Sequence, residues 1–144
     1  EQLTAIATID GLTGISNRRA FHEELDKQWQ RYRRYATPMS LILIDLDHFK
    51  AYNEAFGRTG GDIVIEKVAK LISLLIRQAD FVARFEGQGF VVLAPETGAD
   101  GAMWLAERLR LGIEEAHWTQ RAITASFGLA TSWTAVNADE IIVQ

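Results

Sequence analysis

Two aspartates follow a continuous apolar run. Asp45 and Asp47 come directly after residues 41–44, and such a run is typical of a strand that is covered on both faces. Residues two apart on a strand share a face, so the two carboxylates lie side by side if the strand continues. A cation between them would offset the repulsion, and Mg²⁺ prefers oxygen ligands together with substrate phosphates. The same spacing also fits a solvated acidic loop that caps a helix.

The residues after the second aspartate are suited to an anion. If His48, Phe49 and Lys50 begin a helix, their backbone amides form an anion site, and Lys50 adds a positive charge. Combined with the carboxylates, this segment predicts a metal-phosphate site at the end of a strand.

Hydrophobic periodicity predicts the helices that position this site. Asn17 is expected to cap the first helix, and Asn137 the last. Gly57 is expected to end a short second helix, and Gly60 and Gly61 to separate it from a long third one. The helices are expected over residues 17–34, 48–56, 62–77, 100–115 and 137–144.

The predicted strands complete an α+β domain. They cover residues 41–44, 80–85, 90–94 and 123–131, and the four residues between the second and third include two glycines, which indicates a hairpin. The core order β-α-β-β-α-β is the ferredoxin-like plan, a mainly antiparallel central sheet with helices packed on one face.

Composition limits the classes of protein to consider. The chain has 144 residues, 48% of them hydrophobic, which suits one domain with a substantial core. The net charge of −4 argues against a nucleic-acid partner, and the absence of cysteine excludes disulfides and thiolate metal sites. We expect residues 1–144 to be a single cytoplasmic domain, excised from a larger protein and cut within its last helix. The parent protein could carry an upstream sensor or a membrane anchor.

Four sequence blocks resemble the GGDEF domains of cyclic-di-GMP signalling, in register over nearly the whole chain. The blocks are Asp10-Gly11-Leu12-Thr13-Gly14-Ile15-Ser16-Asn17-Arg18-Arg19, Asp45-Leu46-Asp47-His48-Phe49-Lys50 with Asn53, Gly57 and Gly61-Asp62, Arg84-Phe85-Glu86-Gly87-Gln88-Gly89-Phe90, and Thr124-Ala125-Ser126-Phe127-Gly128-Leu129-Ala130. The resemblance implies a palm-like fold related to nucleotide cyclases. It also implies a homodimer in which two domains face each other and join two GTP molecules into cyclic di-GMP with Mg²⁺.

The resemblance assigns a metal site and a phosphate site to individual residues. Asp45 and the backbone carbonyl of Leu46 match the metal ligands of the family. The backbone amides of His48 and Phe49, together with Lys50, match its phosphate cradle.

A guanine site follows from the same block. Asn53 and Asp62 match the family's guanine readers, and a carboxylate and an amide suit the donor and acceptor groups of guanine. Taken alone, Asn53 also fits a helix end and Asp62 a helix N-cap.

The signature turn departs from the family pattern. Glu86 stands where the first glycine is expected, and Gln88 and Gly89 occupy the two acidic positions, whereas Gly87 and Phe90 match. Gln88 replaces the second metal carboxylate with a neutral amide, a weaker ligand for a dication. Glu86 adds bulk and negative charge near a polyphosphate, and we interpret it as an exposed hairpin residue rather than a replacement ligand.

A possible product site precedes the hairpin. Arg77 and Asp80 match the R-x-x-D motif with which many cyclases bind cyclic di-GMP as an inhibitor. A surface ion pair at a helix end is the alternative interpretation.

Three functions remain open from the sequence. The altered turn favours a degenerate GGDEF domain with lost or impaired cyclase activity. Such a domain would bind cyclic di-GMP or GTP, with Mg²⁺ if GTP is bound, and pass a signal to attached or partner domains. The alternatives are an active diguanylate cyclase and a structural module for dimerisation or domain contact.

Overall fold

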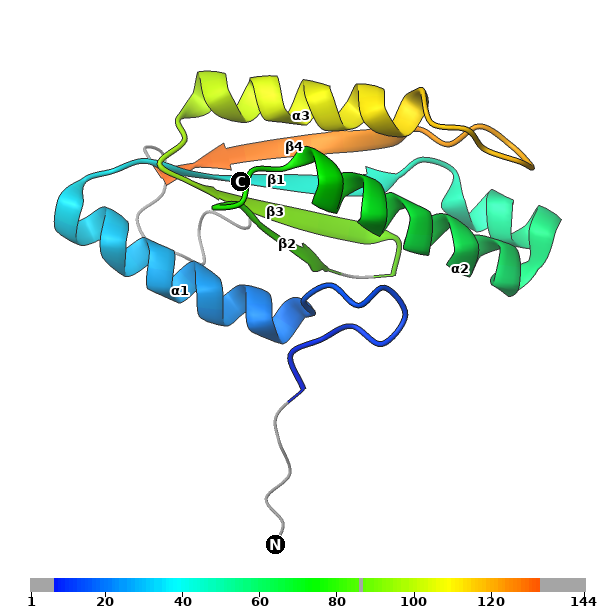
Figure 1. The fold of residues 1–144 in the computed structure, drawn as a ribbon, viewed down its shortest axis with the longest axis horizontal. Coiled ribbons are helices and arrows are strands. Elements are labelled where there is room, and N and C mark those ends of the chain that lie inside the picture. The colour runs from blue at the N-terminus through cyan, green and yellow to red at the C-terminus, as the bar shows by residue number, and fades with distance from the viewer. Residues whose placement is uncertain (1–6, 86, 133–144) are drawn as a thin grey trace, which may run out of the picture.

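The computed structural model describes residues 7–85 and 87–132, and this part of the chain forms three helices and four strands (Figure 1). In chain order they are α1 (Arg18–Tyr35), β1 (Met39–Leu46), α2 (Phe49–Leu75), β2 (Phe81–Arg84), β3 (Gly89–Pro95), α3 (Ala99–Glu114) and β4 (Ala125–Thr131). The expected helix over 137–144, and Glu86, lie outside the described residues. Within them, no helix has the length and apolar character needed to cross a bilayer.

The four strands form one antiparallel sheet in the order β2-β3-β1-β4. The central strand β1 pairs with β3 on one side and β4 on the other, so that Ile44 lies opposite both Phe90 and Phe127. This arrangement confirms the predicted ferredoxin-like plan, and it places the ends of β1, β3 and β4 next to one another.

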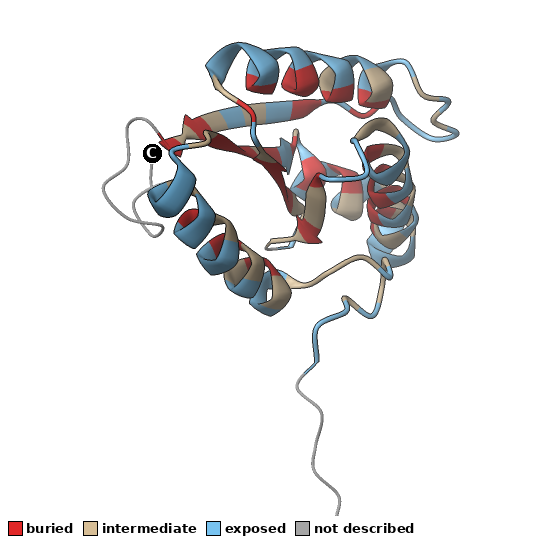
Figure 2. Cartoon of the chain, turned by 60° about the vertical axis from the view of Figure 1, so that its left-hand side comes forward, coloured by how far each residue is buried: buried red, intermediate tan, exposed pale blue. Residues whose placement is uncertain are grey.

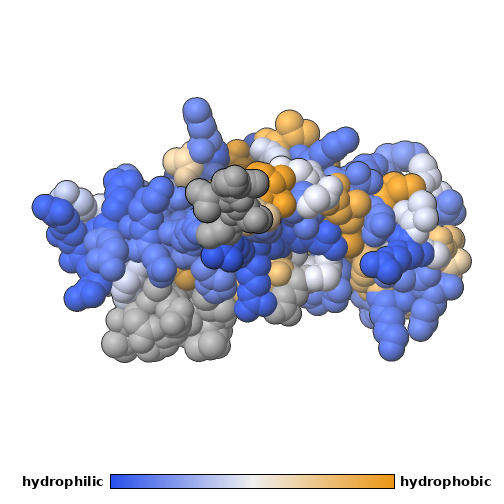
Figure 3. All heavy atoms as spheres, turned by 90° about the horizontal axis from the view of Figure 1, so that it is seen from below, coloured by the Kyte–Doolittle hydropathy of each residue, from blue (hydrophilic) through white to orange (hydrophobic). Residues whose placement is uncertain are grey.

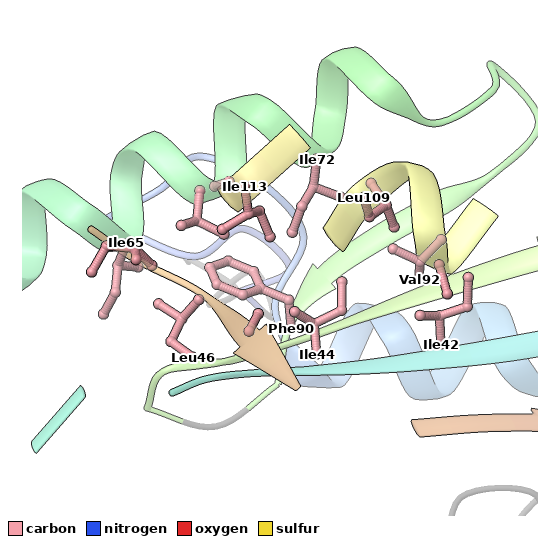
Figure 4. Close-up of a cluster of buried hydrophobic side chains, with 14 of the residues drawn as sticks. Ile42, Ile44, Leu46, Ile65, Ile72, Phe90, Val92, Leu109 and Ile113 are labelled. Carbon is pink, nitrogen blue, oxygen red and sulfur yellow. The ribbon is translucent and has the colours of Figure 1, made fainter. Parts of the chain in front are cut away.

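Two helices pack on one face of the sheet and form the larger core. Ile42, Ile44 and Leu46 alternate along β1 and point toward α2 and α3, where they meet residues such as Ile72 and Leu109 (Figure 4). All of these side chains are buried. The expectation that helices cover one face therefore holds for the β-α-β-β-α-β core.

The opposite face of the sheet is covered by α1. The predicted β-α-β-β-α-β order did not include this helix, so its position was not predicted. Phe21, Leu25 and Trp29 of α1 are buried against Met39 and other residues of the sheet. Figure 2 shows the buried positions of α1 on the side that faces the sheet, and Figure 3 shows a mainly hydrophilic surface when the molecule is seen from below. The molecule therefore has three layers, with the sheet in the middle.

Helix α1 begins as the sequence predicted. The Asn17 side chain accepts a hydrogen bond from the Ala20 amide at 3.0 Å, which satisfies one of the free amides of the first turn. The predicted hairpin is also present, because β2 and β3 are paired and the Phe85 amide donates to the Gly89 carbonyl at 2.9 Å.

The predicted break at Gly57 is confirmed, but the helix resumes before residue 62, earlier than predicted. Gly57 departs from helical geometry, with φ 80° and ψ 167°, but Gly60 and Gly61 lie inside α2, which continues to Leu75. The physical reason is steric, since a β-carbon at residue 61 would lie 1.8 Å from Oδ1 of Asn53. Gly61 therefore allows the backbone of α2 to approach the Asn53 side chain closely, and it does not end the helix.

Candidate functional site

The end of β1 lies beside the turn between β2 and β3. Asp45 is opposite Gly89 of β3 and Ser126 of β4. The Leu46 amide donates to the Gln88 carbonyl at 3.4 Å. The β-ladder thus brings the predicted metal ligands and the altered signature turn to one place.

These residues line a cleft of about 680 Å³, which we call the strand-end cleft. Its lining includes Asp45, Gln88, Gly89 and Ser126, with Asp45 exposed and Gln88 half-buried. The Leu46 side chain is buried in the core, so that its backbone carbonyl is the group left for a ligand.

The Asp47 carboxylate is engaged by hydroxyl groups of the protein. It accepts hydrogen bonds from the hydroxyl of Ser126 in β4 at 2.5 Å and from that of Thr124, directly before β4, at 2.7 Å. These bonds, the Ser126 bond above all, hold the pKa of Asp47 below its ordinary value, with His48 adding a favourable charge. Asp47 therefore links the residues after β1 to Thr124 and Ser126, and a cation shared by Asp45 and Asp47 stays a prediction.

A second cleft of about 640 Å³ opens at the start of α2, and we call it the helix-start cleft. It brings together most of the predicted phosphate and guanine residues with the signature turn. Its lining includes Phe49, Lys50, Asn53, Asp62 and Gln88. Gln88 lines both clefts, so the turn is their common wall.

His48 precedes this cleft in a left-handed conformation, with φ 55° and ψ 30°. Its side chain makes no capping hydrogen bond to α2, and the helix begins at Phe49. The first backbone amides of α2 are consequently not capped by a side chain, which is the condition for an anion to bind there. The role of His48 in a phosphate cradle stays a prediction.

Asn53 has an unusual environment in the helix-start cleft. Its Oδ1 atom is buried and has no hydrogen-bond partner among the described residues, and it packs where Gly61 lacks a β-carbon. A buried polar atom without a partner is costly, so this oxygen is suited to accept a hydrogen bond from a ligand. Asn53 lies in the last turn before the Gly57 kink of α2, as the helix-end interpretation expects, whereas Asp62 lies inside the helical part that follows, so that the N-cap interpretation does not apply to it.

Arg84 links the turn to the opening motif, a connection that sequence reasoning missed. Its Nε and Nη2 donate to the Gly87 carbonyl at 3.1 and 2.9 Å, and its Nη1 lies 3.3 Å from Oδ2 of Asp10. Asp10 also accepts from the Thr13 hydroxyl at 2.7 Å. Burial opposes the charged form of Asp10, but the Thr13 bonds and the Arg84 charge together lower its pKa. The sequence contained one signal for this contact, since Asp10 in the first sequence block and Arg84 in the third carry opposite charges.

The residues at the strand end fit a Mg²⁺ ion poorly. Asp45 is the one acidic residue among the described residues that line the strand-end cleft, and Gln88 offers only a neutral amide. In residues 7–85 and 87–132, no three acidic or histidine side chains are grouped closely enough to hold a metal. A dication would therefore find one charge where hard cations usually take several oxygen ligands.

Arg77 and Asp80 form a close ion pair beyond the other end of the sheet. Nη2 of Arg77 lies 2.8 Å from Oδ1 of Asp80 and also donates to the Thr97 hydroxyl at 2.7 Å. The Asp80 side chain is fully buried, whereas that of Arg77 is 54% exposed. The hydrogen bond with Asp80 raises the pKa of Arg77. Asp80 thus orients the guanidinium, and Arg77 is the member of the pair that can meet a ligand.

A third cleft of about 420 Å³, which we call the Arg77 cleft, contains this guanidinium. It is also lined by Thr97, Gly101, Trp104 and Arg108, the last three from α3. Sequence reasoning did not select Trp104 or Arg108. The sequence did contain a signal for them. Trp104 and Arg108 are four residues apart, so they share one face of α3, and the buried residues of this helix lie on another face.

The antiparallel sheet, its two helices on one face and the clefts at the strand end define a nucleotide-cyclase palm domain. The sequence matches the profile of the diguanylate cyclase GGDEF domain over residues 7–144. The chain belongs to the GGDEF family.

Relatives and solved structures agree with this assignment. The chain is 37% identical over 134 residues to diguanylate cyclase DgcP of Pseudomonas aeruginosa, covering 93% of this chain and 20% of DgcP. The GGDEF domain of DgcB from Caulobacter crescentus, solved with cyclic di-GMP, superposes with a TM-score of 0.90 at 30% identity, over 99% of this chain and 85% of that one.

A third similar structure is diguanylate cyclase SiaD of Pseudomonas aeruginosa in complex with its activator SiaC. It has a TM-score of 0.83 at 29% identity, over 95% of this chain and 57% of SiaD. The chain spans 20% to 30% of the length of the first two curated relatives that it matches, DgcP and the response regulator PleD of Caulobacter vibrioides.

Proposed function

We propose that this chain is a GGDEF signalling domain that binds guanine nucleotides and has lost most or all cyclase activity. The observation that carries the proposal is the charge of the strand-end cleft. Asp45 contributes the carboxylate there, Gln88 stands where the family has its second metal carboxylate, and Asp47 is hydrogen-bonded to Thr124 and Ser126. Because the family joins two GTP molecules with Mg²⁺, a cleft that holds the cation weakly turns over slowly.

Retained nucleotide binding is supported by the helix-start cleft. Asn53 offers a buried acceptor, Asp62 a second acceptor for the guanine edge, and Lys50 a charge for phosphate. The same cleft is lined by Arg58 and Arg84 as well as by Glu54, so that its cations outnumber its carboxylates by one. These groups fit the guanine and the phosphates of GTP, whereas the strand-end cleft offers little to the Mg²⁺ that accompanies it.

A second ligand, cyclic di-GMP, is supported by the Arg77 cleft. Arg77 is oriented by a buried carboxylate, and within the described residues its hydrogen bonds use Nε and Nη2, which leaves Nη1 for a ligand. Arg108 adds a second guanidinium to the cleft. Two arginines suit the phosphates and guanine edges of a cyclic dinucleotide.

The signalling role requires that the bound state reach other domains. We propose that residues 1–144 are one domain of a longer protein, which passes its nucleotide state to an attached sensor, to a partner domain or to a second copy. The structure of SiaD with its activator supports this use of the fold, since that cyclase is bound by a regulatory protein.

The activity test compares the chain with Gln88→Glu. Incubated with GTP and Mg²⁺, the unmodified chain is expected to form little or no cyclic di-GMP, as followed by liquid chromatography. Gln88→Glu is expected to raise Mg²⁺-dependent GTP affinity about tenfold or more, because a carboxylate replaces a neutral amide. Gln120→Glu, an exposed position outside the three clefts, is the matched charge control and should leave the affinity unchanged.

Other outcomes select the other functions. Efficient formation of cyclic di-GMP by the unmodified chain would show an active cyclase and overturn the proposal. If calorimetry finds no binding of either GTP or cyclic di-GMP, the alternative function, a structural module for dimerisation or domain contact, would be supported.

A further inference from the structure

Trp104 is exposed in a way that its helix does not explain. The apolar residues of α3 that face the sheet, such as Leu105 and Leu109, are buried, whereas Trp104 is 64% exposed. Tryptophan is buried for most of its surface in a typical protein. This side chain instead lines the Arg77 cleft, beside a guanidinium that is held in place by a buried carboxylate.

The Trp104 ring has the guanidinium of Arg108 over one face and a glycine on the preceding turn. A helical side chain lies over the turn before its own α-carbon, and here that turn carries Gly101, which has no side chain to cover the ring. The guanidinium of Arg108 lies 5.5 Å from the centre of the Trp104 ring. Both Trp104 and Arg108 are exposed, so a change of rotamer can separate them.

We propose that Trp104 is the stacking platform of the Arg77 cleft and binds one guanine base of cyclic di-GMP on its ring face. This inference rests on the proposed binding of cyclic di-GMP to that cleft. Arg77 binds the phosphate or the guanine edge, and Arg108 packs on the far face of the base. A base between the ring and the guanidinium requires a separation of roughly 7 Å, twice the contact distance of stacked planar groups, so the pair opens by a small side-chain movement.

Stacking on tryptophan makes a distinct contribution to affinity. Base–aromatic stacking depends on the area of the ring and tolerates any base, whereas arginine recognises oxygen and nitrogen acceptors. Loss of Trp104 should therefore weaken binding without abolishing it, and a smaller aromatic ring should restore part of the affinity.

The test is calorimetric titration of the full chain with cyclic di-GMP. Trp104→Ala is expected to weaken binding by about 5- to 150-fold, and Trp104→Phe to recover most of the loss. Met103→Ala is the matched control, because Met103 is the neighbouring residue, is 61% exposed and does not line the cleft. Met103→Ala should bind as the unmodified chain does. Arg77→Ala tests the underlying site and should lose most of the binding.

Fluorescence provides an independent measurement. Cyclic di-GMP is expected to quench tryptophan emission in the unmodified chain, and the quenching should disappear in Trp104→Phe even where calorimetry shows binding. If Trp104→Ala binds with unchanged affinity while Arg77→Ala does not, the stacking inference is wrong and the proposed site stands. If the unmodified chain does not bind at all, the proposed binding of cyclic di-GMP fails, and the inference fails with it.

Discussion

At residue 61, a hydrogen atom stands where every other amino acid would place a β-carbon. The Asn53 amide occupies that space, and its oxygen is buried without a partner among the described residues. The position of one side chain in the helix-start cleft thus depends on a glycine eight residues later in α2, beyond the Gly57 kink. Gly60, one position earlier, has a looser environment, since its nearest neighbour would be the β-carbon of Phe56 at 3.1 Å.

Gly61→Ala is expected to displace Asn53 and to weaken GTP binding about tenfold, the effect of losing one hydrogen bond to a ligand. Overpacking should also lower the free energy of unfolding by about 1–3 kcal/mol, offset by the roughly 1 kcal/mol that alanine adds to a helix. Gly60→Ala is the matched control and should be close to neutral in both respects. Calorimetry with GTP and urea denaturation would check the pair. Equal GTP affinities in the two variants would contradict the assigned role of Asn53.

At the scale of elements, the opening loop and the β2–β3 turn behave as one unit. The loop pairs with β2, because the Arg84 amide donates to the Ser16 carbonyl at 2.9 Å. The Arg84 side chain then connects the Gly87 carbonyl with the Asp10 carboxylate. The Arg84 and Asp10 side chains are 21% and 19% exposed, so the ion pair is shielded from solvent more than a surface pair.

Arg84→Ala is expected to lower the free energy of unfolding by about 2 kcal/mol, because a partly buried carboxylate and the turn both lose a charged donor. Arg19→Ala is the matched control, since Arg19 forms an exposed pair with Glu23 at 4.0 Å. It should cost less than about 1 kcal/mol. Urea denaturation at neutral pH would measure both variants, and equal losses would contradict a structural role for Arg84.

The Asp10 carboxylate should also give this unit a pH dependence. Its pKa is lower in the folded domain than the ordinary value of 3.8, so the unfolded chain takes up the proton first as the pH falls. The stabilisation by Asp10 is therefore complete above about pH 5 and is lost as the pH falls through the lowered pKa. Asp10→Asn should be less stable at neutral pH and lose less further stability between about pH 5 and pH 2. Denaturation midpoints across this range would test it, and parallel pH profiles would contradict it.

The elements themselves were largely predictable from the sequence, because each was encoded locally. The cap at Asn17 and the apolar run at 41–44 depend only on near neighbours. The contacts that were missed join distant residues, since nothing near Asp47 in the sequence indicates hydroxyls from β4. Gly61 was misinterpreted for the same reason, because its lack of a side chain is needed for packing against Asn53 and not for a turn.

For the whole molecule, the sheet is a shared wall between two hydrophobic cores. Phe21 lies in the core under α1 and Ile72 in the core under α2 and α3, and both have no exposed surface. Each strand contributes side chains to both faces, as alternation requires. Neither core can separate from the sheet without exposing the strands to water.

Phe21→Ala is expected to lower the free energy of unfolding by about 3–5 kcal/mol, and Ile72→Ala by about 2–5 kcal/mol. In each variant, far-ultraviolet circular dichroism and tryptophan fluorescence should report one coincident transition, because the sheet couples the two cores. Urea denaturation followed by both signals would measure this. Separate transitions in Phe21→Ala would show that α1 unfolds by itself.

The chain of contacts from Asp10 through Arg84 to Gly87 also has a mechanical meaning. It couples the opening loop to the β2–β3 turn through two side-chain contacts, in addition to the packing of Leu12 and Ile15 against the larger core. Since that turn lines two clefts, a displacement of the opening loop would be expected to reach both of them.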